Sequence, residues 1–235
     1  LGQELGQLEQ TLQNYTRAIR DLKQTKFIYM NERYRQVVLN LLGEAADPCQ
    51  LVGSAYDETA LLPVHVQAND RNAIFNVYFH KAILCYLFQN QAAAVENIAL
   101  AKEYAGNTPG LLLVLLLRFY ESLIGLAVFT TVSRAEQRRI WQQVKRNQRQ
   151  MQTWATAAPM NHQHKFYLVE AERHRVQGQF TAAIAAYDRA IALAAEHDYI
   201  HEMALSNVLA ARSCLAQGKA RFAQVYLIDA YYGYA

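Results

Sequence analysis

The chain has 235 residues, of which 52% are hydrophobic, and this composition excludes an intrinsically disordered protein. Ten glycines and four prolines are too few for a loop-rich β-sandwich, and a net charge of +3 gives no basis for binding nucleic acid or an anionic membrane. Three cysteines, Cys49, Cys85 and Cys214, lie in apolar surroundings without a ligand-like spacing, so we expect reduced core residues and a cytoplasmic protein.

Residues 1–45 predict an N-terminal pair of helices. Apolar residues from Leu1 to Leu22 recur with alternating steps of four and three, which places them on one seam of a helix. The seam would pack on a second helix, approximately Lys26–Leu42, although a short coiled coil explains the same spacing. Residues 46–71 follow as a predicted loop, because Asp47-Pro48, Gly53 and Pro63 interrupt any helical period.

Residues 72–158 predict further helices, starting with the pair Asn72–Phe88 and Gln91–Tyr104 and a break at 107–110. The apolar stretch Leu111–Phe129 has the length of a membrane span, but Arg118 and Glu121 in its middle favour a helix buried by protein. Ser133 followed by Glu136 predicts a capping box for a helix ending near Ala157. Pro159 would stop that helix, and Asn161 would cap the next one.

Residues 159–235 predict two degenerate helical repeats. Aligning the segment with itself at an offset of 40 residues (211 − 171) matches small residues with small ones and glycine with glycine. This is the tetratricopeptide pattern, with small residues where paired helices cross and glycine at the turn, although its usual period is about 34 residues. The matched pairs are Ala171 with Ala211, Gln177-Gly178 with Gln217-Gly218, Ala183 with Ala223, Tyr187 with Leu227, and Ala190 with Ala230.

The fold prediction is therefore all-α, with antiparallel helix pairs stacked as a tetratricopeptide-like α-solenoid over residues 1–235. No segment alternates with period two, so we expect no sheet. The first residue is not methionine and the last residues, Tyr-Tyr-Gly-Tyr-Ala, continue a helical pattern, so we also expect a fragment of a longer chain.

The sequence offers no catalytic, cofactor or metal site. It has neither a phosphate-binding loop ending in Lys-Ser/Thr nor a Gly-x-Ser-x-Gly elbow. His197 and His201 have a helical metal-ligand spacing, but they fall at a predicted turn and lack two further ligands. We therefore expect no enzyme, no cofactor and no metal.

Candidate contacts with a protein partner come from three places. Arg138, Lys145 and Arg149 share one face of a long helix, where they suit an acidic protein partner or simply form a solvated face. His164 and Lys165 follow Trp154 and Pro159 in a distinctive string, which is either a ligand-facing surface or a structural helix junction. At the C-terminal end, Ala223, Leu227 and Ala230 would face their own helix partner. Tyr231 and Tyr234 would point toward a following helix, so we expect self-association there or folding back of the Leu1 seam.

The chain resembles the helical region of large multidomain signalling proteins common in cyanobacteria, over residues from about Tyr15 to the end. Those proteins combine a serine/threonine kinase domain, an AAA-like predicted ATPase, a helical region, a GAF sensor and often a histidine kinase. No active-site residue of that family has a counterpart here. The strings that carry the resemblance are Leu62-Pro63, Asn69-Asp70, Lys81 with Tyr86-Leu87-Phe88, Phe119-Tyr120-Glu121-Ser122-Leu123, Trp154 to Glu172, and Tyr187-Asp188-Arg189-Ala190-Ile191.

The resemblance implies a non-catalytic segment for protein interaction or regulation, lying between the ATPase and the GAF and histidine kinase domains. The alternative is a constitutive scaffold or dimerisation spacer without an external ligand. We expect neither nucleic acid nor a membrane as partner, and either reading leaves the identity of the protein partner open.

Overall fold

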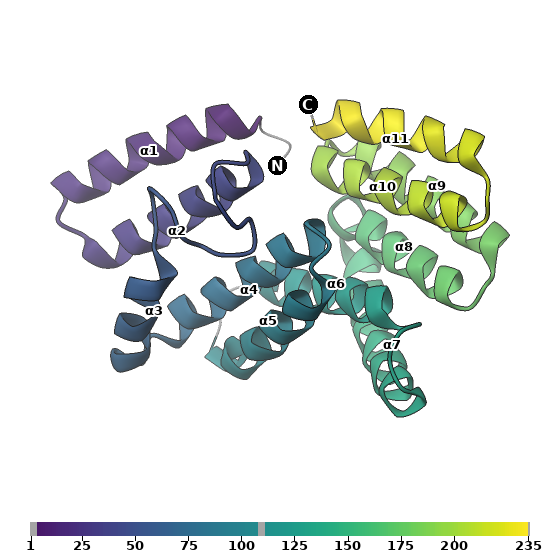
Figure 1. Ribbon diagram of the computed structural model, residues 1–235, viewed down its shortest axis with the longest axis horizontal. Helices are drawn as coiled ribbons and strands as arrows, with labels where there is room; N and C mark the ends of the chain where they lie inside the picture. Colours follow the sequence, from purple (N-terminus) through teal and green to yellow (C-terminus); the bar gives the residue numbers. More distant parts are fainter. Residues whose placement is uncertain (1–3, 108–110, 235) are drawn as a thin grey trace. The chain divides into compact units, whose positions relative to one another are not determined.

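A computed structural model describes residues 4–107 and 111–234, and the regular structure in this part of the chain is helical apart from one isolated β-bridge between Val52 and Asp57 (Figure 1). The predicted all-α class is confirmed for this part of the chain. The helices are α1 (Leu5–Asp21), α2 (Thr25–Leu41), α3 (Glu58–Gln67), α4 (Arg71–Leu87), α5 (Gln91–Tyr104), the 3₁₀ turn η1 (Ala105–Asn107), α6 (Leu111–Val128), α7 (Arg134–Ala157), α8 (Pro159–Val176), α9 (Phe180–Glu196), α10 (Ile200–Ala216) and α11 (Ala220–Tyr234).

Most of the connections between helices use the same turn, in which one residue with positive φ follows the helix end. Gly178 and Gly218 take this position after α8 and α10, with φ of 74° and 68°, as the repeat pattern predicts. The next amide then donates to a carbonyl in the last turn, as Gln179 does to His174 at 3.0 Å. Asp198 takes the same position after α9, so the turn does not require glycine. Such short turns force neighbouring helices to run antiparallel.

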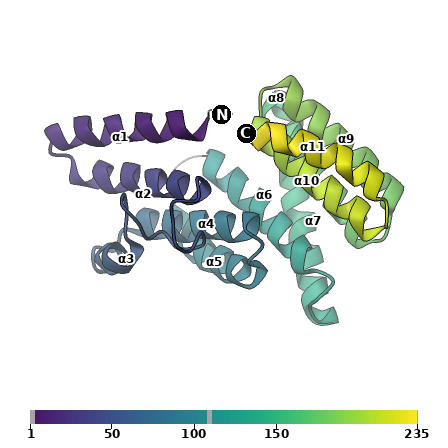
Figure 2. The ribbon, with the colours of Figure 1, turned by 45° about the horizontal axis from the view of Figure 1, so that its top comes forward.

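Contacts divide the chain into two compact units, with the boundary between Leu117 and Arg118 inside α6, whereas the sequence suggested a single module. In the first unit, α1 packs on α2, α2 and α3 pack on α4, and α4 packs on α5 (Figure 2). The α1 seam is covered only in part, because Tyr15 and Leu22 remain exposed, and Leu1 lies outside the described residues. The break predicted at Thr108–Gly110 also lies outside them.

The predicted loop over 46–71 is wrong in its second half, because α3 occupies Glu58–Gln67. Asp57 caps this helix by accepting a hydrogen bond from the Thr59 amide at 2.9 Å. Pro63 inside the helix and the absence of an apolar period conceal it in the sequence. The first half of the predicted loop is irregular, as expected. It is held in place by the buried Gln36 side chain, which accepts hydrogen bonds from the amides of Ala55 and Tyr56 at 3.1 and 3.2 Å.

In the second unit, successive helices from α7 to α11 pack on one another, and α8 also contacts α10. The small residues of the repeat pattern are buried here: Ala171, Ala183 and Ala190 have no exposed surface, and Ala211, Ala223 and Ala230 have at most 3%. A side chain larger than alanine at these positions would push the helices apart. The small residues that the repeat pattern predicts at helix crossings are thus buried.

Two predictions at the ends of α7 have different outcomes. Ser133 caps the helix by accepting a hydrogen bond from the Glu136 amide at 3.3 Å, as predicted. Asn161 does not cap α8, because that helix already begins at Pro159. Proline suits the first position of a helix, since the backbone N–H that it lacks would have no partner within the helix there. Instead, Asn161 accepts a hydrogen bond from the hydroxyl of Tyr199 at 2.9 Å.

The long apolar helix α6 packs within the protein, where the amide of Asn147 donates to Glu121 at 2.8 Å and Arg118 donates to Asn147 at 3.2 Å. Both charged groups that interrupt the apolar stretch therefore meet a polar partner on α7. Of the helices that the structure describes, none is long and apolar enough to cross a membrane.

Candidate interaction surface

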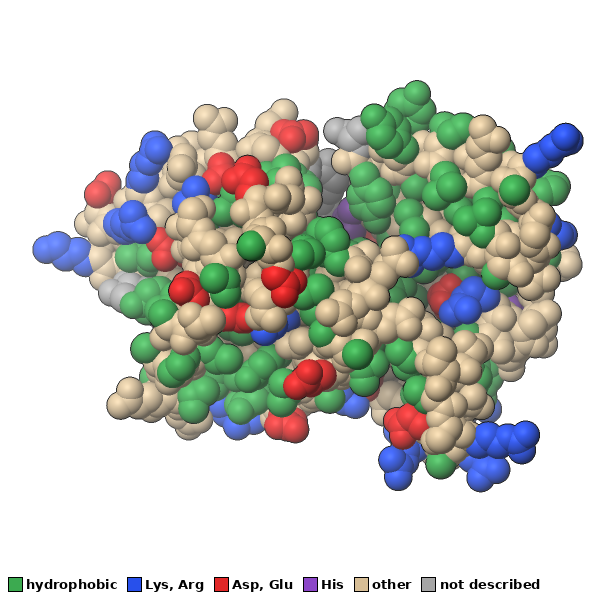
Figure 3. Space-filling view, viewed as in Figure 1, with side chains coloured by type: hydrophobic (Ala, Val, Ile, Leu, Met, Phe, Trp, Pro, Cys, Tyr) green, Lys and Arg blue, Asp and Glu red, His purple; other side chains and the backbone are tan. Residues whose placement is uncertain are grey.

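Helix α11 exposes large apolar side chains over most of its circumference. It buries Ala223 and Ala230 on the side of α10, while seven larger residues stay in contact with solvent, as the green side chains over α11 in Figure 3 show. A helix that is apolar on most sides is usually covered by protein. These residues, between 45% and 75% exposed, are Phe222, Val225, Leu227, Ile228, Tyr231, Tyr232 and Tyr234.

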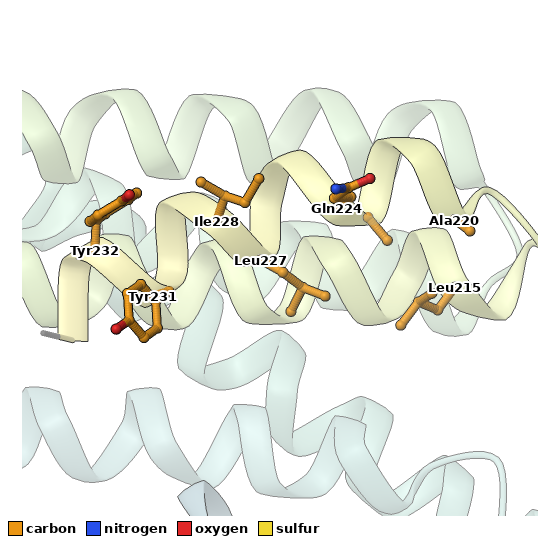
Figure 4. A pocket seen from close by; sticks show the side chains of 8 residues that line it. Leu215, Ala220, Gln224, Leu227, Ile228, Tyr231 and Tyr232 are labelled. Atoms are coloured by element: carbon orange, nitrogen blue, oxygen red, sulfur yellow. The ribbon is translucent and has the colours of Figure 1, made fainter.

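Part of this surface forms a groove of about 320 Å³ along α10 and α11 (Figure 4). Leu215 contributes from α10, and the other lining residues belong to α11. The lining contains no charged side chain, so the groove suits an apolar ligand rather than a phosphate or a carboxylate. We call it the α10/α11 groove, and it is lined by Leu215, Ala220, Ala223, Gln224, Leu227, Ile228, Tyr231 and Tyr232.

The repeat offset explains why this groove is open. Leu227 corresponds to Tyr187 in α9, whose side chain is fully buried, but Leu227 is 45% exposed. The prediction that Leu227 faces its own helix partner is therefore wrong. Tyr187 is closed in by α8, where Glu172 accepts a hydrogen bond from its hydroxyl. Helix α11 packs on α10 and reaches α9 through the hydrogen bond from the Tyr226 hydroxyl to Asp188 at 2.6 Å, but among the described residues no element covers Leu227 to the same extent.

Tyr231 is 68% exposed, in agreement with its predicted orientation away from the hairpin of α10 and α11. Tyr234 is 53% exposed, but its hydroxyl is buried near Arg212 and Glu202 of α10, so it does not point away from the hairpin as predicted. Tyr231 lines the groove, so one of the two predicted aromatic contacts belongs to this surface. Whether either residue contacts a protein stays a prediction.

Arg138, Lys145 and Arg149 are exposed on α7, where Figure 3 shows basic side chains gathered near one end of the helix. Lys145 lies over the ring of Trp141, 5.8 Å from its centroid, and the Arg173 guanidinium from α8 lies 5.0 Å from the same centroid. Cation–π contacts thus involve Lys145 in packing within this unit. Arg138 and Arg149 remain on the solvated face that the sequence predicts.

His164 and Lys165 are buried, with 2% and 3% exposure, which contradicts a ligand-facing surface and agrees with the alternative, a structural helix junction. Lys165 Nζ lies 2.8 Å from Glu202 Oε1 and 2.8 Å from His164 Nε2. The same ammonium lies 4.3 Å from the ring centroid of Tyr199. We call His164, Lys165, Tyr199, His201 and Glu202 the Lys165 cluster; it joins α8 to the beginning of α10.

The electrostatics of the Lys165 cluster keep Glu202 charged and His164 neutral. Burial alone would raise the pKa of Glu202, but His201, at 2.7 Å, and the Lys165 ammonium outweigh it and lower that pKa to about 2. Burial and the neighbouring ammonium lower the pKa of His164 to about 3, so its imidazole is neutral. Burial also lowers the pKa of Lys165, partly offset by Glu202. The cluster therefore links α8 to α10 through a buried ion pair between Lys165 and Glu202.

The paired histidines do not form a metal site in the structure. His197 ends α9, whereas His201 belongs to α10 rather than to the predicted turn and contacts Glu202. Across the described residues, no group of three or more His, Cys, Asp or Glu side chains is placed to hold a metal ion.

Glu202 and Tyr199 could not be assigned to a cluster from the sequence, because they lie more than thirty residues after Lys165 (199 − 165 = 34). A local signal existed only for the segment around His164, as an unusual concentration of polar residues at a helix start.

No protein-family model matches the chain, and neither the curated proteins nor the solved structures contain a significant match.

Proposed function

We propose that this chain is a non-catalytic helical-repeat module that binds a helical segment of a protein through the α10/α11 groove. The observation that carries the proposal is the exposed, uncharged groove on the last helix pair. A protein helix with an apolar stripe is the ligand whose shape and chemistry match such a groove.

A tetratricopeptide-like solenoid of paired helices is the finer architecture that we propose. It is supported by the buried alanines at matching positions of α8–α9 and α10–α11 and by the left-handed glycines at both turns. In such an array each helix pair buries its apolar face on a neighbour. A helix bound in the α10/α11 groove would then cover the exposed apolar residues of α11.

The family resemblance suggests where the module works. In a cytoplasmic signalling protein of that kind, it would lie between an ATPase domain and the GAF and histidine kinase domains. Catalysis would belong to those other domains, and the helical module would transmit or restrain their activity by binding protein. This part of the proposal depends on the resemblance alone.

A constitutive scaffold is the second candidate function. It is favoured by the uncharged and mostly apolar lining of the groove, since permanent interfaces are more apolar than those that form and dissociate. In that case the occupant is another part of the same assembly and does not exchange with a separate partner.

Site-specific photocrosslinking in cells tests the proposal. A photoreactive phenylalanine analogue replaces Tyr231 in the groove, and the same analogue replaces Arg149 on the solvated face of α7 as the matched control. We expect crosslinks from position 231 to one defined helical segment and none above background from position 149. A separate protein as the crosslinked species supports a binding module, and a segment of the same assembly supports the scaffold.

Leu227→Lys provides the second arm, because a charge in the apolar lining should abolish the crosslink from position 231. Leu227 is half exposed, so this substitution leaves the buried core unchanged. Equal crosslinking from positions 231 and 149, or crosslinking that persists in Leu227→Lys, would overturn the proposal.

A further inference from the structure

Helix α11 carries a second apolar face, distinct from the part of the groove around Leu227. Phe222, Val225 and Tyr232 are 66%, 60% and 75% exposed, and steps of three and seven residues place them on one side of the helix. We call these three residues, with Arg221 and Asp229 beside them, the outer face of α11.

Stacking of another repeat does not explain the outer face. The equivalent residues of α9, forty positions earlier, are Ala182, Ala185 and Ala192, and none of them is buried. A solvent-facing side of α9 is therefore made of alanines, while the matching side of α11 has two aromatic residues and a valine. Large apolar residues concentrated there indicate a contact that α9 does not make.

The charges of the outer face are complementary to themselves. Arg221 and Asp229 lie four residues before and four residues after Val225, and all three lie on the same side of the helix. If two α11 helices run antiparallel with Val225 at the centre, Arg221 of one is level with Asp229 of the other. The same pairing puts Phe222 level with Ile228. Oppositely charged residues therefore meet each other, and apolar residues meet apolar residues.

We propose that the outer face of α11 pairs two copies of this chain, with the helices antiparallel and Val225 on the twofold axis. A twofold contact needs a self-complementary surface: if one residue contacts a second residue of the other copy, that second residue of the first copy contacts the same first residue of the other. The charge and apolar pattern around Val225 has this property. Pairing centres on a side of the helix away from Leu227, although Ile228 and Tyr232 belong both to this contact and to the lining of the groove.

The size of the face predicts a weak dimer. In this register Phe222, Val225 and Ile228 meet the partner helix, whereas Tyr232 is level with Gly218, outside α11. Aromatic side chains bury about 150–250 Å² each when fully covered, so the exposed parts of the three meeting side chains add up to roughly 300 Å² per copy. The total of about 600 Å² is below the standard size of a stable interface, which makes dissociation on the order of micromolar or weaker. Dimers should therefore appear in sedimentation equilibrium at tens to hundreds of micromolar protein, a range that we estimate from the same interface size.

Cysteine crosslinking tests the geometry directly. Val225→Cys places two thiols on the proposed axis, so oxidation should give a covalent dimer quickly. Arg138→Cys on the exposed face of α7 is the matched control, and Cys49, Cys85 and Cys214 are buried and should contribute little background. Equal rates of dimer formation from positions 225 and 138 would overturn the proposal.

Charge reversal tests the register without a crosslink. Arg221→Glu or Asp229→Arg alone creates like-charge contacts and should raise the dimer Kd by roughly threefold to tenfold, as for exposed ion pairs. The double variant exchanges both charges and should restore the parent Kd. A double variant at least as weak as the singles would exclude the antiparallel register, and Leu227→Lys should leave the dimer unchanged.

Discussion

Removing one member of the buried pair between Lys165 and Glu202 should destabilise the protein far more than removing both. Their side chains are 4% and 3% exposed, so a single substitution leaves a buried charge without its main partner. Glu202→Leu leaves the ammonium with His164, and neutralising an amine of ordinary pKa 10.5 at pH 7 costs about 5 kcal/mol, an upper limit for the loss. Within that limit we expect about 3–5 kcal/mol.

Lys165→Met should cost less, about 3 kcal/mol, because His201 still lies 2.7 Å from the Glu202 carboxylate. The double variant Lys165→Met/Glu202→Leu removes both charges and fills the space with apolar atoms, so its cost should stay below about 2 kcal/mol. The free energy of coupling between the two positions is then about 4 kcal/mol or more, the sum of the two single losses less that of the double variant.

Urea denaturation of the parent, both single variants and the double variant measures this coupling at pH 7. Arg149→Ala, on the solvated face of α7, is the control and should change the free energy of unfolding by no more than about 0.5 kcal/mol. A double variant whose loss equals the sum of the two single losses would show that the ion pair does not anchor α8 to α10.

Three further predictions concern packing, pH and the loop before α3. Ala183→Trp and Ala223→Trp should each destabilise by about 1–3 kcal/mol or more in chemical denaturation, because both alanines are buried between paired helices; an unchanged midpoint for Ala183→Trp would refute the repeat register. The pKa values of His164 and His80 are each lowered to about 3 in the folded protein, so the unfolded chain binds more protons below pH 6.5. The free energy of unfolding should fall from pH 6.5 to 5 by up to about 1.4 kcal/mol per pH unit for each histidine. Removing one of these histidines with His164→Gln should reduce that slope. A slope unchanged by His164→Gln would show that this histidine is not buried in its neutral form. Gln36→Leu should expose the segment 47–56 to limited proteolysis, since the amides of Ala55 and Tyr56 lose their acceptor, whereas equal cleavage rates would contradict the pinned loop.

The sequence was most informative where structure depends on neighbouring residues. The Ser133 cap, the glycine turns at 178 and 218 and the buried alanines follow from local rules of helix ends and helix crossings. Helix α3 was missed because a proline and a weak apolar period hide a segment that Asp57 caps and α4 supports. Tertiary contacts there outweigh an unfavourable local propensity.

The candidate site shows the same division between local and distant causes. An all-helical chain with matched small residues, and with aromatic residues gathered near its last residues, can be predicted from periodicity and repeat spacing, because these are properties of neighbouring positions. The burial of His164 and Lys165 and the exposure of Leu227 become evident only in the folded protein. Burial depends on which distant element covers a residue: Glu202 on α10 receives the Lys165 ammonium, while among the described residues no helix covers Leu227.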